Sequence, residues 1–251
     1  MKKLFYLMGV VLFLTSCAEL GKLAKQMEQV AANLPPSEQE NISGIKSALD
    51  VGIQNAVKNL TQVDGFMGDQ LVKILLPPEA KPIADHIKLI PGGEKLMNDF
   101  ILLMNRSAED AVKQATPIFA NAIRSMTISD ALGILRGGEN AATQYLRRNT
   151  ENDLKQAFQP RIKTSLNKKL VGNVSASQSW KVLADNYNKL ALSAVGRASN
   201  LKPVSVNLEG YVTQKALDGV FLKLADEEKL IRKNPAARVN DLLRKVFGQL
   251  D

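Results

Sequence analysis

Apolar residues recur at intervals of three and four along most of this chain, and this spacing constrains the fold more than any other feature of the sequence. Side chains at those intervals share one face of an α-helix, whereas a half-buried strand needs alternation with a period of two. Credible alternation is missing, and the one short extended candidate, Pro203–Val206, has no partner strand. The sequence therefore predicts a single all-α domain whose helices cover one another's apolar faces.

Prolines, glycine pairs and capping residues divide this pattern into segments. Ser37 and Glu40 form a capping box at the start of the first long helix. Thr150 with Asp153 starts another helix, which we expect Pro160 to kink or break. The pattern of residues 191–206 favours neither a helix nor a strand. Helices are expected over residues 37–60, 78–89, 94–115, 116–126, 127–136, 139–149, 150–172, 177–190, 207–233 and 234–248.

Residues 127–150 contain the densest set of capping and turn residues in the chain, and they predict two short helices joined by a turn. Thr127 and Asp130 give a capping-box-like start. Gly137 and Gly138 are expected to end the first helix in positive-φ conformations. The apolar face of the first helix would hold Ile128, Leu132 and Leu135.

The first sixteen residues have the features of a bacterial signal peptide. Lys2 and Lys3 precede an apolar run, Leu4–Leu14, that is too short to span a bilayer as a helix. Leu14-Thr15-Ser16-Cys17 resembles a lipobox, in which cleavage precedes the cysteine and its thiol is acylated; an ordinary signal peptide with an incidental cysteine is the alternative. Because Cys17 is the only cysteine, we expect lipidation there and attachment to a membrane through two or more acyl chains.

The residue after this cysteine and the charge of the chain bear on its location and partners. Ala18 stands where Asp would favour retention in the inner membrane, so the likeness to Gram-negative lipoproteins implies an outer-membrane anchor facing the periplasm. Removing residues 1–16 takes away two lysines and no acid, which lowers the formal net charge from +8 to +6. This modest, dispersed excess does not indicate nucleic acid; it suits a basic surface, anionic lipid headgroups or acidic glycans.

Pro35 and Pro36 mark the expected domain boundary, because consecutive prolines fix an extended link. We assign residues 1–16 to the signal peptide, 17–36 to a lipid-anchored tether and 37–251 to the helical domain. With a single cysteine the domain has no disulfide, so hydrophobic burial must hold it together. A chain of this length is ample for one core.

Several catalytic and metal-binding chemistries are disfavoured by residue counts. His86 is the only histidine, which disfavours histidine-based triads, zinc sites and di-iron sites; it is expected on a helix surface or at the edge of the core. Neither glycine fingerprint for phosphate binding is present. The helix start after Gly138 could draw an anion, but Glu139 already complements its dipole and would repel a phosphate. No cofactor or metal is expected.

Acidic residues remain candidates for a catalytic or metal-binding site, because paired carboxylates can perform acid–base chemistry or hold a hard cation. Asp218, Asp226, Glu227 and Glu228 lie along one predicted helix. We interpret the last three as a solvated face, in which Glu228 stands four residues before Arg232 in a common helix-stabilising pair. Asp218 differs because apolar neighbours surround it, so it is expected to face a basic partner.

Two polar helix faces form the strongest candidate site, either for binding or for structure. Asp218 is expected to pair with Arg147 or Arg148 where the faces meet. In one version they form a buried polar network that fixes helix packing; in the other, spare donors on Arg136 and Arg147 receive an anionic ligand or partner group. The candidate residues are Arg136, Gln144, Tyr145, Arg147 and Arg148 on the first face, and Tyr211, Gln214, Lys215 and Asp218 on the second.

Three stretches resemble the bacterial domain-of-unknown-function family 4197. They are TPIFANAIRSMT (116–127), ISDALGILRGGENAATQYLRR (128–148) and YVTQKALDGVFLKLADEEKLIRKNPAAR (211–238). The resemblance covers roughly residues 40–248. It implies a helical, exported protein of uncharacterised role, and it transfers no catalytic residue.

These observations together favour a lipid-anchored envelope protein that faces the periplasm and binds an envelope protein or an anionic ligand without catalysis. A carboxylate-based hydrolase acting on an envelope substrate is the enzyme alternative, and it would need several acids with a raised pKa in one cleft. A structural spacer is the third alternative, and it would have no pocket or polar cluster.

Overall fold

The computed structural model describes residues 34–129 and 131–251. The expected signal peptide, Cys17 and nearly all of the tether lie outside these residues, as does Asp130. Regular secondary structure in the described ranges is helical throughout, so the predicted all-α single domain is confirmed. The α-helices are α2 (Glu38–Leu60), α3 (Lys81–Asp85), α4 (Gly93–Val112), α5 (Ala115–Ser125), α6 (Ala131–Leu135), α7 (Ala141–Asn167), α8 (Ala176–Leu192), α9 (Ala194–Ala198), α10 (Leu208–Lys233) and α11 (Asp241–Phe247). Short 3-10 helices are η1 (Pro78–Ala80), η2 (Ile87–Leu89), η3 (Pro235–Ala237) and η4 (Gly248–Leu250).

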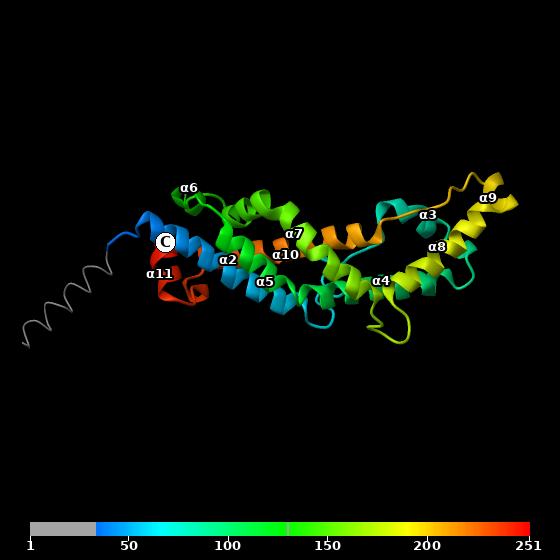
Figure 1. Ribbon diagram of the computed structural model, residues 1–251, viewed down its shortest axis with the longest axis horizontal. Helices are drawn as coiled ribbons and strands as arrows, with labels where there is room; N and C mark the ends of the chain where they lie inside the picture. The colour runs from blue at the N-terminus through cyan, green and yellow to red at the C-terminus, as the bar shows by residue number, and fades with distance from the viewer. Residues whose placement is uncertain (1–33, 130) are drawn as a thin grey trace, which may run out of the picture.

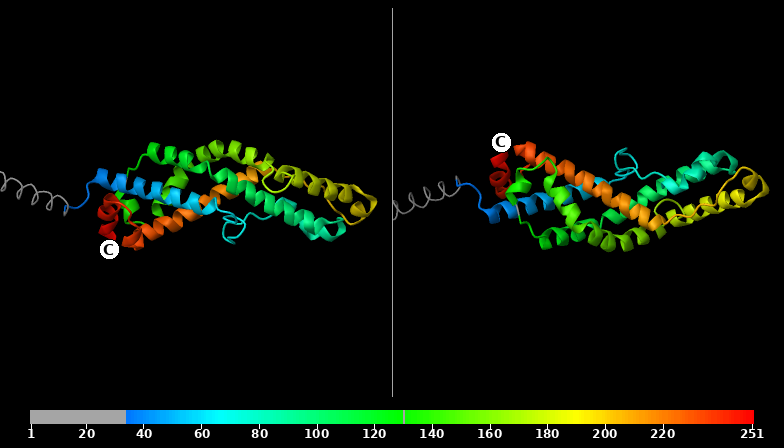
Figure 2. Two further views of the ribbon diagram at one scale, coloured as in Figure 1. Left: turned by 90° about the horizontal axis from the view of Figure 1, so that it is seen from below. Right: turned by 90° about the horizontal axis from the view of Figure 1, so that it is seen from above.

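The helices form an elongated bundle (Figures 1 and 2). At one end α2, α5, α7, α10 and α11 pack together, and α6 lies beside them. At the other end α4 and α8 run side by side, and α3 and α9 complete the tip. The described chain begins and ends at the first end, so α9 is at the extremity farthest from both.

The core depends on the close packing of α2 against its neighbours. α10 lies against both α2 and α7, and its apolar stripe is buried between them. A Cβ at Gly52 would lie 2.7 Å from Leu224 Cδ1, and one at Gly44 would lie 2.7 Å from the methyl carbons of Val246. Because only glycine leaves room for these contacts, α10 and α11 approach α2 more closely than a larger residue would allow. The buried stripe of α10 includes Val212, Ala216, Leu217, Val220 and Leu224.

The predicted break at Thr150 is wrong, because α7 continues through it to Asn167. The Thr150 side chain is buried, and its hydroxyl donates to the Leu146 carbonyl 2.7 Å away, one turn earlier in the same helix. A threonine that bonds back in this way fits a helix interior instead of capping a new helix. Pro160 also lies inside α7, so the helix is not ended there.

Three turns differ from the sequence expectations. Gly137 and Gly138 do not have positive φ; a Cβ at Gly137 would lie 2.8 Å from that of Ala141, so close approach is what requires glycine there. Leu132 is exposed, so it does not share the buried face expected for this helix.

The final segment is not one helix: Asn234 caps η3, and α11 begins separately after Asn240. Residues 78–89 are likewise divided among η1, α3 and η2.

Two extended segments are held by asparagine side chains instead of by partner strands. The side chain of Asn105 on α4 accepts from the Ile74 N–H at 2.9 Å and donates to the Ile74 carbonyl at 2.8 Å. Asn188 on α8 makes the same pair of bonds with Val204, at 2.7 and 3.0 Å. An amide side chain has one donor and one acceptor side, so it can satisfy both backbone groups of an isolated extended residue. This explains how residues 203–206 stay extended without a sheet.

Candidate functional site

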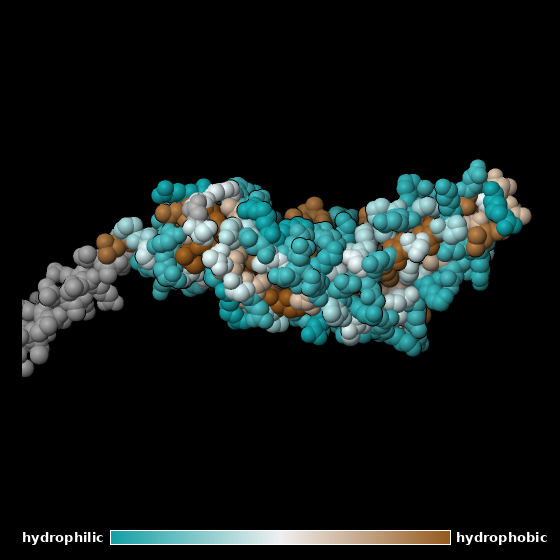
Figure 3. Space-filling model, turned by 45° about the horizontal axis from the view of Figure 1, so that its top comes forward, coloured by the Kyte–Doolittle hydropathy of each residue, from teal (hydrophilic) through white to brown (hydrophobic). Residues whose placement is uncertain are grey.

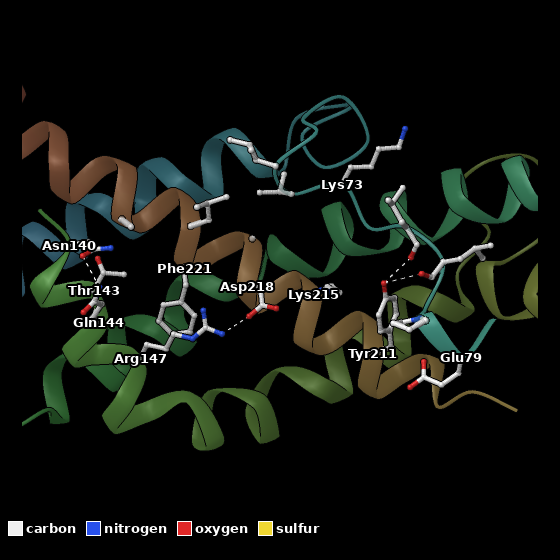
Figure 4. Close-up of a pocket in the computed structure, with 18 residues that line it drawn as sticks. Lys73, Glu79, Asn140, Thr143, Gln144, Arg147, Tyr211, Lys215, Asp218 and Phe221 are labelled. Carbon is white, nitrogen blue, oxygen red and sulfur yellow. Dashed lines mark hydrogen bonds and ion pairs between the residues drawn. The ribbon is translucent and has the colours of Figure 1, made fainter. Parts of the chain in front are cut away.

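An open groove of about 960 Å³ follows α10 between the start of α7 and the extended segment 71–79 (Figure 4). Its lining contains both apolar and hydrogen-bonding side chains. From α10 come Tyr211, Lys215, Asp218, Gly219, Phe221, Leu222 and Ala225; from the start of α7 come Asn140, Thr143, Gln144 and Arg147; from the extended segment come Leu71, Val72, Lys73, Leu75, Leu76, Pro78 and Glu79.

The two predicted polar faces meet in this groove. Arg147 Nη2 on α7 donates to Asp218 Oδ1 on α10 at 2.5 Å and to Glu151 Oε1 at 3.0 Å. Gln214 closes the network by donating to Glu151 at 2.9 Å and to Asp218 at 3.2 Å. The guanidinium carbon of Arg147 also lies 5.1 Å from the centre of the Phe221 ring. Asp218 therefore pairs with Arg147, and Arg148 takes no part.

This network is only partly shielded from solvent. The side chains of Arg147 and Asp218 are 37% and 34% exposed. Hydrogen bonding to Arg147 lowers the pKa of Glu151, and the hydrogen bonds to Glu151 and Asp218 raise the pKa of Arg147. Glu151 and Arg147 are therefore both charged at neutral pH, and together with Asp218 and Gln214 they form one positioned polar surface in the groove. The network joins α7 to α10, as the first of the two predicted versions requires, but it is only partly buried.

Tyr211 ties the extended wall of the groove to α10. Its hydroxyl donates to the Leu75 carbonyl at 3.0 Å and lies 3.4 Å from that of Leu76 (Figure 4). Burial raises the pKa of the Tyr211 phenol, so it stays protonated as a donor. Together with the bonds from Asn105 to Ile74, this contact fixes the position of the segment from both sides.

The groove is lined by exposed leucine side chains and by charged side chains without ionic partners. Leu71, Leu75 and Leu222 are 75%, 57% and 37% exposed. Lys73 and Lys215 line the same groove, and neither has an acid within ion-pair distance among the described residues; Lys215 Nζ lies 6.0 Å from the Tyr211 ring centre. Glu79 is likewise without a cationic partner in the described part of the chain, so the unpaired charges are two positive and one negative.

The remaining predicted site residues are dispersed. Gln144 lines the groove and donates to Asn140 at 2.9 Å. Tyr145 turns away from it, donating to the Thr127 carbonyl at 2.7 Å and lining a separate cleft beside α5. Arg136 and Arg148 are exposed and lie outside the groove. The predicted role of Arg136 as a donor beside Arg147 therefore has no geometric basis.

The interpretation of Glu228 as a solvated residue is wrong. Its side chain is 1% exposed, and it accepts from the backbone N–H groups of Ala142 and Thr143 at 3.0 and 2.7 Å. Arg232, also buried, donates to Glu228 at 2.8 Å and to the carbonyls of Leu135 and Ile134. Glu228 thus caps α7 from another helix, while Arg232 satisfies the end of α6.

The spacing of apolar residues along α10 could have predicted that Glu228 is buried. Glu228 stands four residues after Leu224 and three before Ile231, both buried, so it lies on the apolar face of its own helix. Glu228 also disfavours the binding of a further anion at the start of α7, because the backbone N–H groups there already donate to its carboxylate. Glu139 instead pairs with Lys229 at 2.8 Å and with Lys233.

Two further polar residues, Asn105 and His86, lie outside the lining of the groove. Asn105, which sequence reasoning missed, is fully buried at a position within the stripe of α4, and nothing in its spacing marks it as a bridge to residue 74. His86 is half-buried and its Nδ1 lies 3.0 Å from the Pro82 carbonyl, as expected for the edge of the core. Within residues 34–129 and 131–251, no three His, Cys, Asp or Glu side chains are grouped to hold a metal ion. Across the same ranges, no helix has the length and apolar character needed to cross a membrane.

Comparison with known proteins gives a family but no described function. No curated protein and no solved structure matches the chain. Residues 35–248 match the family described as "Protein of unknown function (DUF4197)". This match spans the groove, the Arg147 network and the Glu228 cap, as well as nearly every described helix. The chain belongs to the DUF4197 family.

Proposed function

We propose that this protein is a lipid-anchored envelope protein that faces the periplasm and binds a segment of another envelope protein in the groove along α10. The lipobox-like sequence at Cys17 supports the anchor, and Ala18 supports the outer membrane. The groove supports the binding role. The single observation that carries the proposal is the presence of three exposed leucines and two unpaired lysines on one elongated surface.

The shape of the groove favours a peptide segment over a compact small molecule. It follows α10 from Tyr211 to Ala225, a distance of about 21 Å at 1.5 Å per residue. An extended peptide of about six residues covers that length at roughly 3.3 Å each. The presence of both apolar and polar groups suits such a segment, because its side chains can contact the leucines while its backbone bonds to amide groups.

The charge pattern favours an acidic segment with apolar side chains. The carboxylates of Asp218 and Glu151 are already bonded to Arg147, whereas Lys73 and Lys215 remain available. Lys215 lies between Asp218 and Tyr211 on α10, so an acidic side chain of the partner would meet it at the middle of the groove (Figure 4). Arg147 bonds through Nε and Nη2 to Glu151 and Asp218, so its Nη1 group is the donor left for a second contact in the groove.

The two alternatives have less support. A carboxylate-based hydrolase needs an acid with a raised pKa, and among the described residues each carboxyl whose pKa departs from its usual value has a lowered one. A spacer would need neither a groove nor the exposed leucines within it. Both alternatives predict that changing those leucines has no effect on partner capture.

Charge substitutions in the groove test the proposal. Leu75→Asp or Leu222→Asp places a carboxylate on the apolar surface, and Lys215→Glu reverses the unpaired charge. We expect each to remove specific proteins that co-purify with the membrane-extracted protein. Leu230→Asp is the matched control, since Leu230 is 48% exposed on the same helix but outside the groove. Identical sets of co-purifying proteins for all four variants would contradict the proposal.

A further inference from the structure

A second surface stands at the extremity of the molecule, where α8 ends and α9 begins. Ser193 caps α9 by accepting from the Gly196 N–H at 3.1 Å, and the Leu201 N–H donates to the Gly196 carbonyl at 2.9 Å. A Cβ at Gly196 would lie 2.1 Å from the Leu190 carbonyl oxygen, so α9 is folded tightly against the end of α8. This tight turn gives the tip a defined shape.

The turn directs apolar side chains outward. Leu192 is 58% exposed although it directly follows the buried Ala191, and Val195, three residues later, is 66% exposed. Figure 3 shows apolar residues at this end of the molecule beside hydrophilic ones. Neither residue belongs to the buried core, so both side chains are free to make a contact outside the domain.

The same tip carries positive charge without compensation from its own segment. Lys189, Arg197 and Lys202 are exposed, and none has an acid within ion-pair distance in the described chain. Residues 186–208 contain no Asp or Glu. The preceding acid, Asp185, is bound by Lys181 at 2.5 Å.

Neighbouring elements do not neutralise this charge. Asp85 on α3 is bound by Lys81 at 2.6 Å. Lys88 and Glu94, at the start of the adjacent α4 region, add one charge of each sign, and neither is ion-paired among the described residues. The tip therefore keeps an excess of three cations around two exposed apolar side chains.

We infer that this tip, formed by residues 189–202, docks on an anionic lipid surface. It is the convex extremity of the bundle in both side views, so a flat surface can meet it (Figures 1 and 2). Cations near a membrane are attracted to negatively charged headgroups, and apolar side chains between them enter the boundary of the acyl region. An amphipathic, uniformly basic tip is complementary to that surface in both respects.

This inference is independent of the groove. The tip lies at the end of the molecule opposite the start of the described chain, while the groove runs along its middle (Figure 1). The contact would orient an anchored protein, either by laying it along its own membrane or by reaching another one. Its failure would leave the proposed binding of a partner segment untouched.

A polarity-sensitive dye at the tip tests the inference. The full chain carries Ser199→Cys, an exposed position on the tip, and the parent protein treated with the same dye sets the background from Cys17. The protein is reconstituted with phosphatidylcholine vesicles or with vesicles containing about a third phosphatidylglycerol, each with spin-labelled lipid as a quencher. We expect quenching in the anionic vesicles only, with loss in about 1 M salt, where screening acts within about 3 Å.

The matched variants remove three charges each. Combining Lys189→Ala, Arg197→Ala and Lys202→Ala should weaken the quenching contact about a hundredfold, since each cation near the surface strengthens it about fivefold. The control combines Lys58→Ala, Arg148→Ala and Arg161→Ala, which are exposed cations without an ionic partner in the described chain, and it should quench like the parent. A dye at Lys169→Cys, in the exposed loop before α8, should stay unquenched.

Three results would overturn the inference. Equal quenching in neutral vesicles would mean that no anionic surface is recognised. Unchanged quenching in the tip variant would mean that these cations do not make the contact. Absence of quenching in both vesicles would exclude a lipid surface and leave an acidic protein as the occupant of the tip.

Discussion

Asp218 and Glu228 lie on the same helix in opposite environments, and the difference determines what each contributes. Glu228 is 1% exposed and holds two backbone N–H groups and a buried guanidinium, whereas Asp218 is 34% exposed beside a partly exposed Arg147. Leaving a buried charge without its partner costs far more free energy than breaking a pair in contact with water. Stability should therefore depend on Glu228, whereas Asp218 with its partner Arg147 forms part of the surface of the groove.

We expect Glu228→Ala to lower the free energy of unfolding by about 3–5 kcal/mol, because Arg232 and the start of α7 lose their carboxylate. Asp218→Ala should cost about 1 kcal/mol, as a solvent-exposed pair does. Urea unfolding followed by circular dichroism measures both. Equal losses for the two variants would contradict this division between structure and binding.

Acidic pH should weaken the domain through surface carboxylates. Hydrogen bonds from Lys229, then Lys233, lower the pKa of Glu139 to about 2, and bonds from Lys245 and Ser37 lower that of Glu40 to about 2. A carboxyl whose folded pKa is below its unfolded value of 4.5 stabilises the fold above that value. This stabilisation is lost as pH falls from about 4.5 towards 2.

The variant Glu139→Gln should reduce this dependence on pH, because an amide cannot titrate. The free energy of unfolding of the variant and the parent, measured by urea at several pH values, should differ most at neutral pH and converge at low pH. A constant difference across that range would show that Glu139 does not contribute through its ionisation.

At the scale of elements, the helix pattern was predictable wherever one face is apolar. α2, α4, α8 and α10 begin and end within a few residues of their expected positions. The errors arose where a contact from elsewhere decides the outcome. Thr150 reads as a cap but bonds back within α7, and the start of α7 is capped by Glu228 from another helix.

The candidate site was predictable in part for the same reason. Spacing along two helices placed Arg147, Gln214 and Asp218 on facing surfaces, and they do meet. The third wall was not foreseen, because residues 71–77 show only a short apolar run. Their position is set by Asn105 and Tyr211, two long-range contacts that no local pattern encodes.

Asn105→Ala should therefore damage both the fold and the groove. It leaves the buried N–H and carbonyl of Ile74 without partners, which should cost about 3 kcal/mol. We also expect faster hydrogen exchange in residues 71–77. Asn188→Ala is the control, because it frees Val204, which does not line the groove, and should leave exchange in residues 71–77 unchanged.

At the scale of the whole molecule, the structure is an elongated bundle with a groove at mid-length, and we propose that the bundle is anchored to a membrane. Lipidation is the expectation that follows most directly from the sequence. Cys17→Ser should release the protein from the membrane fraction and abolish incorporation of labelled fatty acid, because no other cysteine is present to accept the lipid. A variant that still labels and sediments with membranes would contradict the anchor.

The central claim is that the groove, and no other apolar part of α10, contacts a partner in the cell. The most direct measurement places a photoreactive amino acid at Leu222 in the groove, or at Leu230 outside it, in cells that express the full protein. Both residues are exposed leucines on one helix, so they differ chiefly in location. The account predicts a discrete crosslinked product from Leu222 that disappears when Lys215→Glu is added, with none from Leu230. The same products from both positions, or none from Leu222, would contradict it.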